Sequence, residues 1–486
     1  MDTGSINLLR LTKYEKVLIT LFVVTLPLIN PWVRGDGIGY YAFARAPLIE
    51  HSLDFTRDWL AANTSFRMSR VDANGLLIQE QFTATGHIDN HFSLGPAILW
   101  SPFLIAAHVG VVLYNHLGGR IPVDGFSRPY RVAMAFGTAL YGFLALFISF
   151  GVARKFISER QAFLAVLGIW FGSSLPVYMY FNPSWSHAHS AFVVALFVWY
   201  WIRTRDGRTW QQWVILGLLG GLMMDVYYMN AVLFLLPLLE SMAGYRAIIL
   251  RASSESVGSL LFKNCILVLG FLVAFAPTLI TKRIIYGSFW NFGYTERWFP
   301  GSPAFFKVCF SANHGLFTWT PIMLLAVVGL VVLRKYDGNL ALYSIIVFLV
   351  YVYSLGCYED WNGISSYGNR FLVSLTTLFI LGLAALFDWL GHVWQDQRAG
   401  AVAWTGTAVL ALWNLGLIFQ WGMHLIPDRG PISWSNAAFN QVVVVPVQVG
   451  RSLSNYLLHR QELMDRIEKQ DVNQLKSQHE GTRVSP

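Results

Sequence analysis

Residues 17–41 of this chain read VLITLFVVTLPLINPWVRGDGIGYY. The first part of this stretch is almost entirely apolar, and a carboxylate, Asp36, follows it in a glycine-rich segment. Because basic residues precede the apolar run and no small-residue cleavage site follows it, we expect a retained membrane helix with a cytoplasmic N-terminus. Asp36 would then lie at the non-cytoplasmic mouth of this helix, where an ionisable side chain is usually functional.

The composition predicts an all-α polytopic membrane protein. Of the 486 residues, 55% are hydrophobic and 13% are charged, and the mean hydropathy is +0.47. A soluble domain carries roughly 25% charged residues. Apolar runs recur along the chain, each near the roughly 20 residues that span a bilayer. They fall at about 17–33, 97–117, 131–152, 162–181, 187–202, 212–225, 227–241, 264–281, 316–333, 339–356, 371–390 and 401–421.

Charge and cysteine content exclude several classes of function. The net charge of +8 reflects topology and lipid contact in a membrane protein, and no basic stripe interleaved with aromatics points to nucleic acid. Cys265, Cys309 and Cys357 have neither disulfide-framework nor metal-site spacing. His187 and His189 are two residues apart, so they would not share one face of a helix as a metal pair.

The charges of the short loops predict which side of the membrane each loop occupies. Loops 153–160, 203–208 and 334–335 are rich in Lys and Arg, whereas loops 182–186 and 357–369 contain neither. Basic loops stay in the cytoplasm, so the first three loops are expected inside and the other two outside.

An even number of spans must then precede residue 153, although three apolar runs occur there. The run at 97–117 contains Pro102, His108 and Asn115 and is the least uniformly apolar of the three. We expect it to lie in, or dip into, the outer interface. An ordinary span that violates the charge rule is the alternative. The sequence therefore predicts about eleven transmembrane helices and an outside C-terminus.

This topology divides the chain into two segments. Residues 1–421 form the transmembrane domain, in which 34–130 is a large outer first loop with interfacial helices. Residues 422–486 form an outer-face tail. The tail includes an amphipathic helix whose apolar side carries Leu453, Tyr456, Leu457 and Met464.

The outer loops also carry the candidate functional side chains. Loops that only connect helices are usually about 4–6 residues long, so a first loop near 100 residues is expected to have a function. Asp36 could merely cap a helix or turn, but its position at the helix mouth favours a catalytic role. The candidates for substrate binding are Tyr40, Arg45, His91, Arg131, His187, Asp360, Asn369 and Arg370.

Together these features resemble the GT-C superfamily of membrane glycosyltransferases. The similarity is to the branch that contains protein O-mannosyltransferases and lipid A aminoarabinose transferases, with an acidic residue after the first helix and a large first outer loop. It covers most of residues 10–390. The blocks that resemble poorly characterised bacterial GT-C-like proteins are 36–41, 90–96, 183–187, 315–321 and 365–370.

The resemblance implies transfer of a sugar from a polyprenyl phosphate to a glycan, lipid or protein acceptor, with inversion. It also implies a bacterial inner membrane and an active site on the periplasmic face. Asp36 would act as the acceptor base or contact a metal, and a divalent cation stays open as a cofactor. The arginines Arg45, Arg131 and Arg370 would hold the phosphate.

The sequence departs from the family pattern at one position. The mannosyl and aminoarabinosyl branch often has a second acidic residue in the second outer loop, where this chain has Ser186 and His187. Two other functions stay open: a transporter or flippase of lipid-linked sugars, and a catalytically silent relative that binds lipid. A transporter would place charges near the bilayer midplane and show repeats, whereas here the polar groups cluster on one face.

Overall fold

The structure is a computed structural model that describes residues 11–394 and 396–483. Residues 1–10, 395 and 484–486, which the two predicted segments include, lie outside it. In the described part the secondary structure is helical, and the β pairings are isolated bridges. The predicted all-α class is therefore confirmed.

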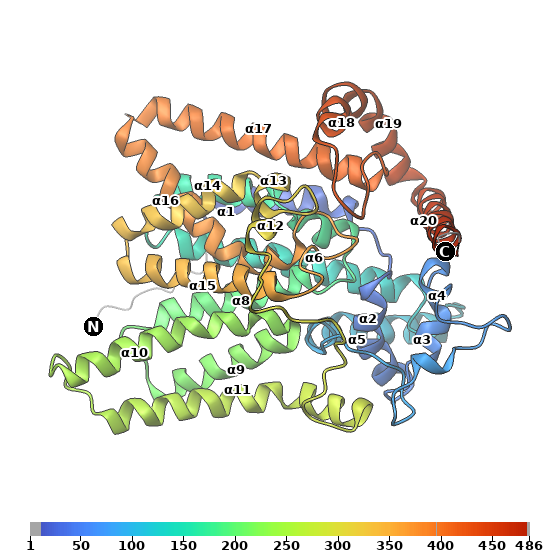
Figure 1. Ribbon diagram of the computed structural model, residues 1–486, viewed down its shortest axis with the longest axis horizontal. Helices are drawn as coiled ribbons and strands as arrows, with labels where there is room; N and C mark the ends of the chain where they lie inside the picture. Colours follow the sequence, from blue (N-terminus) through green and yellow to red (C-terminus); the bar gives the residue numbers. More distant parts are fainter. Residues whose placement is uncertain (1–10, 395, 484–486) are drawn as a thin grey trace.

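Long apolar helices run side by side and form most of the molecule (Figure 1). Seven helices in the described part are long and apolar enough to cross a membrane, so the chain is an integral membrane protein. The total of eleven spans stays a prediction, because shorter helices complete the bundle. The seven are α5 (Gly95–His116), α6 (Arg128–Ala153), η4 with α10 (Tyr228–Ile249), α11 (Val257–Tyr286), α15 (Gly338–Cys357), η6 with α16 (Arg370–Val393) and the Gly400–Gly422 part of α17 (Asp396–Gly422).

Three of the apolar runs, 17–33, 162–181 and 316–333, do not form one continuous helix each. Each interruption lies beside a proline, which cannot donate a backbone hydrogen bond within a helix. The shorter elements are α1 (Lys13–Thr25), η1 (Leu26–Leu28), α7 (Glu159–Gly172), η3 (Val177–Phe181), α8 (His187–Thr204), α9 (Trp210–Val226), α12 (Phe305–Phe310), α13 (Leu316–Trp319), α14 (Ile322–Val332) and η5 (Leu333–Lys335).

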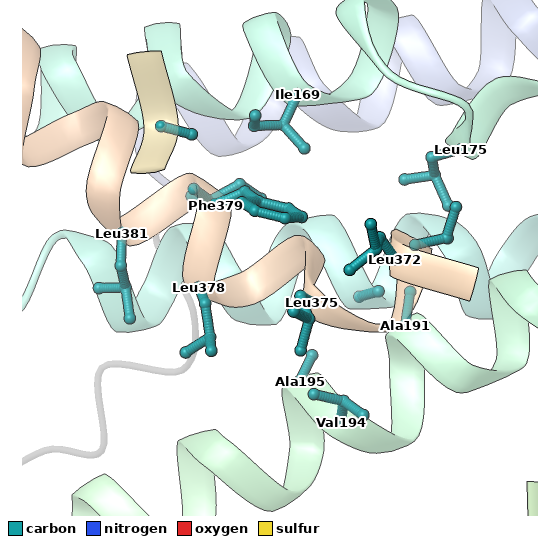
Figure 2. Close-up of a cluster of buried hydrophobic side chains, with 14 of the residues drawn as sticks. Ile169, Leu175, Ala191, Val194, Ala195, Leu372, Leu375, Leu378, Phe379 and Leu381 are labelled. Atoms are coloured by element: carbon teal, nitrogen blue, oxygen red, sulfur yellow. The ribbon is translucent and has the colours of Figure 1, made fainter. Parts of the chain in front are cut away.

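The core of the bundle surrounds α16. This helix is buried along its whole apolar length. Figure 2 shows Leu375 and Leu378 directed at α8, where Ala195 leaves room for them, and Phe379 directed at Ile169 of α7. Large side chains on one helix facing small ones on the next allow close packing.

The loops gather at two opposite ends of the bundle, as the charge pattern predicts. At one end, Arg205 pairs with Asp337 and its guanidinium lies over the Phe156 ring, so the three basic loops share that end. Arg154 pairs with Glu15 there, at 2.8 Å. Loops 182–186 and 357–370 lie at the other end, which we call the cavity end. That this end faces outward stays a prediction.

The first loop folds entirely at the cavity end. Both ends of α5 lie there: Gly95 packs on the backbone of Asp225 and Val226, and the chain after α5 brings Gly125 against Arg45. This is the arrangement expected of a helix that does not cross, although α5 is long enough to do so. The loop's other helices are α2 (Asp36–Ile49), α3 (Thr56–Ala61), α4 (Thr64–Arg67) and η2 (Gln79–Gln81).

The C-terminal tail returns to the cavity end and covers it (Figure 1). The single amphipathic helix predicted there is divided at His459, whose backbone leaves the helical conformation. The tail elements are α18 (Trp434–Phe439), η7 (Asn440–Val444), α19 (Val445–Leu458) and α20 (Arg460–Arg483).

Labelling of cysteines from outside the cell tests this topology. In a Cys265→Ser background, which removes the exposed native thiol, we expect an impermeant maleimide to label Arg120→Cys but not Asp206→Cys. Both positions are exposed, at opposite ends of the bundle. Both variants should react after detergent solubilisation. External labelling of Asp206→Cys would overturn the orientation, and external protection of Arg120→Cys would mean that α5 crosses.

Candidate active site

A cavity of about 1250 Å³ opens at the cavity end of the bundle. Its walls come from the first loop, the loops before α8 and α16, the segment after α11, and the tail. Six of the nine predicted site residues line it, although they are spread over more than 300 positions of the sequence. They are Asp36, Tyr40, His91, His187, Asp360 and Arg370.

Asp36 begins helix α2 and is directed at Arg370. Gly35, the residue before it, has a positive φ of 53°, which glycine adopts without strain. Gly37 packs so closely on Ser184 that an added Cβ would lie 2.0 Å from its hydroxyl. These two glycines hold the start of α2 against loop 182–186, and Asp36 Oδ2 lies 2.9 Å from Arg370 Nη1.

The guanidinium of Arg370 is held by an aromatic ring and keeps free donors. It lies 4.3 Å from the centroid of Trp185, whose indole N–H donates to the Arg34 carbonyl at 3.0 Å. Arg370 Nε is buried and has no hydrogen-bond partner among the described residues. A planar guanidinium with unused N–H groups can grip a phosphate bidentately.

Tyr40 and His91 line the cavity beside this ion pair. Tyr40 accepts a hydrogen bond from Ser186 at 3.0 Å, and burial together with the charge of Asp36 raises its pKa. The His91 ring lies 5.0 Å from that of Tyr294, and burial lowers the pKa of His91 below its usual value. Both side chains are therefore neutral at neutral pH and can serve as hydrogen-bonding groups for a sugar.

His187 and Asp360 complete the predicted set within the cavity. The His187 ring packs edge-on against Tyr227 at 5.8 Å, and its Nδ1 has no partner in the described part of the chain. The pKa of the Asp360 carboxyl is raised by partial burial and by the neighbouring Glu296. Asp360 is thus one of several acidic groups that line the cavity besides Asp36.

Three predicted residues lie outside the cavity lining. Arg45 is fully buried and binds both carboxylate oxygens of Asp58 at 2.6 Å, with Glu50 at 2.9 Å. This arginine stabilises the fold of the first loop. Asn369 donates to the carbonyl of Trp361, and Arg131 lies on α6 away from the lining.

Other polar residues of the cavity were not among the candidates. Arg34 stands in the motif quoted first, and its proximity to Asp36 was a usable signal. Tyr294 and Glu296 come from the segment after α11, and Asp471 comes from the tail. Nothing in the local sequence connects these three to Asp36.

The described residues include no group of three or more His, Cys, Asp or Glu side chains arranged to hold a metal. The polar centre of the cavity is instead the ion pair between Asp36 and Arg370. Such a centre provides one proton acceptor and one anion-binding group side by side.

Comparisons with known proteins find likeness among solved structures. No protein-family model and no curated protein matches the chain. Among solved structures, the crystal structure of ArnT from Cupriavidus metallidurans in the apo state is similar, with a TM-score of 0.44 and 14% sequence identity. The match covers 84% of this chain and 71% of that chain.

The buried Arg45–Asp58 pair gives a test of the first loop's stability. Asp58→Ala would remove the bidentate partner of the buried Arg45 guanidinium and leave it only the partly exposed Glu50. Breaking a buried ion pair typically costs about 3–5 kcal/mol. We expect a markedly lower melting temperature for the purified protein, measured in detergent. The control is Arg57→Ala, which removes an exposed ion pair to Glu50 at 3.3 Å and should change little. Equal melting temperatures for Asp58→Ala and wild type would contradict this role.

Proposed function

We propose that this protein is a membrane glycosyltransferase that moves a sugar from a polyprenyl-phosphate donor to an acceptor at the cavity end. The observation that carries the proposal is the Asp36–Arg370 pair, 2.9 Å apart in one large cavity. It puts a candidate base and a candidate phosphate ligand within reach of the same substrate. The GT-C resemblance of the sequence agrees with this assignment.

The chemistry requires both groups of the pair. The acceptor hydroxyl oxygen forms a bond to the anomeric carbon while the bond from that carbon to the phosphate oxygen breaks. The electron pair leaves with the phosphate, a weak base that needs stabilisation of charge more than a proton. Arg370 supplies the positive charge, and Asp36 accepts the proton of the hydroxyl.

Donor binding would also activate Asp36. Arg370 is paired with the Asp36 carboxylate, at 2.9 Å. A phosphate that takes over the guanidinium would release the carboxylate oxygen from this contact. The released oxygen could then accept the hydrogen bond of the acceptor hydroxyl.

An apolar part of the cavity next to Arg370 suits the polyprenyl chain. We call it the first arm and define it by Met224, Tyr227, Leu355 and Phe371. Met224 belongs to α9, Leu355 to α15 and Phe371 to η6, and Tyr227 lies between α9 and η4. The Phe371 ring lies 5.2 Å from the Arg370 guanidinium. A lipid phosphate at Arg370 can thus bury its chain without leaving the cavity.

Further details of the proposal follow from the sequence. The basic loops put the cavity on the outer side, which in a bacterial inner membrane is the periplasmic face. The rival function, a flippase, would need charged groups along a path through the bundle. The charged residues that line this cavity instead come from the loops, the tail and the helix termini at one end, which favours the transferase.

Complementation of a gene deletion tests the proposal. Deletion should cause one lipid-linked sugar to accumulate and one envelope glycan modification to disappear, as seen by mass spectrometry of lipid extracts. Wild type should reverse both changes. Asp36→Asn should fail, because loss of a general base lowers rates by about 10²–10⁴-fold. Arg370→Gln should also fail.

The matched control is Asp54→Asn, the same substitution at an acid of the same loop. Asp54 is not part of the cavity lining, and its side chain accepts a hydrogen bond from the Thr56 backbone N–H, a role that asparagine also fills. All variants should reach wild-type amounts in the membrane. Full complementation by Asp36→Asn would overturn the proposed role of Asp36, and no change in lipid-linked sugars on deletion would overturn the transferase.

A further inference from the structure

A second apolar arm of the cavity lies on the other side of the Asp36–Arg370 pair. We define it by Leu415, Ile418 and Phe419 of α17 and by Val449, Leu453 and Tyr456 of α19. Figure 1 shows α17 and α19 along the upper edge of the view and α9, which carries part of the first arm, in the lower half. The cavity therefore extends to both sides of its charged centre.

The spacing of the residues in the second arm shows that one face of each of two helices forms it. Val449, Ser452, Leu453 and Tyr456 follow the spacing i, i+3, i+4, i+7, which puts all four on one face of α19. Leu415, Ile418 and Phe419 repeat the spacing on α17. Two apolar helix faces are thus turned toward one space.

The opposite face of α19 carries exposed apolar side chains together with the polar residues Arg451 and Ser454. Val447 and Leu458 are 80% and 75% exposed, and Val442 just before the helix is 75% exposed. In water such a patch would favour aggregation, whereas on a helix at a bilayer surface it contacts lipid. We therefore place α19 at the membrane interface, so the second arm adjoins the lipid from which a hydrocarbon chain could enter.

The residues of α20 that line the cavity are mostly apolar, with two polar residues near the middle of the helix. They are Leu463, Met464, Ile467, Asp471, Gln474 and Leu475.

Polar contacts fix this helix on the first loop. Asp471 pairs at 2.7 Å with Arg34, two residues before Asp36, and Glu468 accepts hydrogen bonds from Ser65 N at 2.6 Å and Asn63 at 2.8 Å. These contacts fix the tail on the first loop, with Asp471 beside Arg34 and hence close to Asp36.

These observations identify the acceptor's chemical class, on the basis of the proposed function. We infer that the second arm binds the hydrocarbon chain of the acceptor, so that the acceptor is an amphiphilic lipid whose hydroxyl group reaches Asp36. Arg370 adjoins the first arm through Phe371, and Asp36 adjoins the second through Arg34 and Asp471. The cavity of about 1250 Å³ also exceeds the roughly 300–1,000 Å³ typical for one small ligand.

Photo-crosslinking tests the inference without any transfer reaction. The full-length protein is placed in phosphatidylcholine nanodiscs with a trace of phosphatidylglycerol that carries a diazirine at the end of one acyl chain. Crosslinked peptides are mapped by mass spectrometry. We expect saturable labelling within 415–422 and 449–467 that excess unlabelled phosphatidylglycerol reduces and excess polyprenyl phosphate does not.

Bulky substitutions give the matched comparison. Leu453→Trp and Ile418→Trp fill the second arm from its two walls, and each should lower the labelling several-fold. Leu458→Trp is the control, because it lies on the same helix but outside the lining. Size-exclusion profiles show whether each variant is folded. Because the two variants lie on different helices, one of them still tests the inference if the other fails to fold.

Three results would overturn the inference. Equal labelling in Leu453→Trp, Ile418→Trp and Leu458→Trp would mean that only surrounding lipid is labelled. Competition by polyprenyl phosphate would assign the arm to the donor. Absence of labelling in both segments would mean that no lipid chain occupies the second arm. None of these depends on transfer, so loss of activity in Asp36→Asn would still support the proposed function when this inference fails.

Discussion

The ion pair between Asp36 and Arg370 is the interaction on which the cavity end depends. It joins the first residue of α2 to the first residue of η6, so it ties the start of the first loop to the central helix of the bundle. Arg370 is 11% exposed and Asp36 32% exposed. A charge this far removed from water needs a partner, yet the pair stays accessible enough to exchange that partner for a ligand.

The walls around this pair are positioned by polar contacts that have no local sequence signature. Lys282, buried on α11, donates to the carbonyls of Asn90, His91 and Phe92 at 3.0–3.1 Å. Those three hydrogen bonds fix the segment that puts His91 in the cavity and Phe92 against the Tyr40 ring, 4.7 Å away. A lysine near the end of a membrane helix otherwise looks like one that extends to the interface.

Prediction from sequence succeeded where the physics is local and failed where it depends on distant partners. Apolar runs and basic loops gave the helical class and the grouping of loops, because both follow from hydropathy and charge along the chain. Asp36 and Arg370 stood out as charges at helix mouths. Arg45 stood out equally, but its ion pairs with Asp58 and Glu50 give it a structural role. From the sequence alone, such an arginine cannot be distinguished from one that binds a phosphate.

The tail shows the same limit over a longer distance. Its amphipathic pattern was visible, and Tyr456 donates a hydrogen bond to the Leu28 carbonyl at 2.8 Å. The pattern specified that one face is apolar, without specifying the surface it covers. Packing against a cavity wall and lying on lipid require the same periodicity, so only the folded chain distinguishes them.

The position of the pair between two apolar arms has a consequence for the order of events in the proposed reaction. Asp36 is paired with Arg370, the proposed donor phosphate would reach Arg370 from the side of Phe371, and the acceptor would approach from the side of Arg34. A hydroxyl that arrives first would meet a carboxylate oxygen already occupied by the guanidinium. Activation of the acceptor would therefore require the donor phosphate, and this coupling would suppress proton abstraction in its absence. Separating the two chains on opposite sides of one ion pair is thus a physical means of making the base depend on the leaving group.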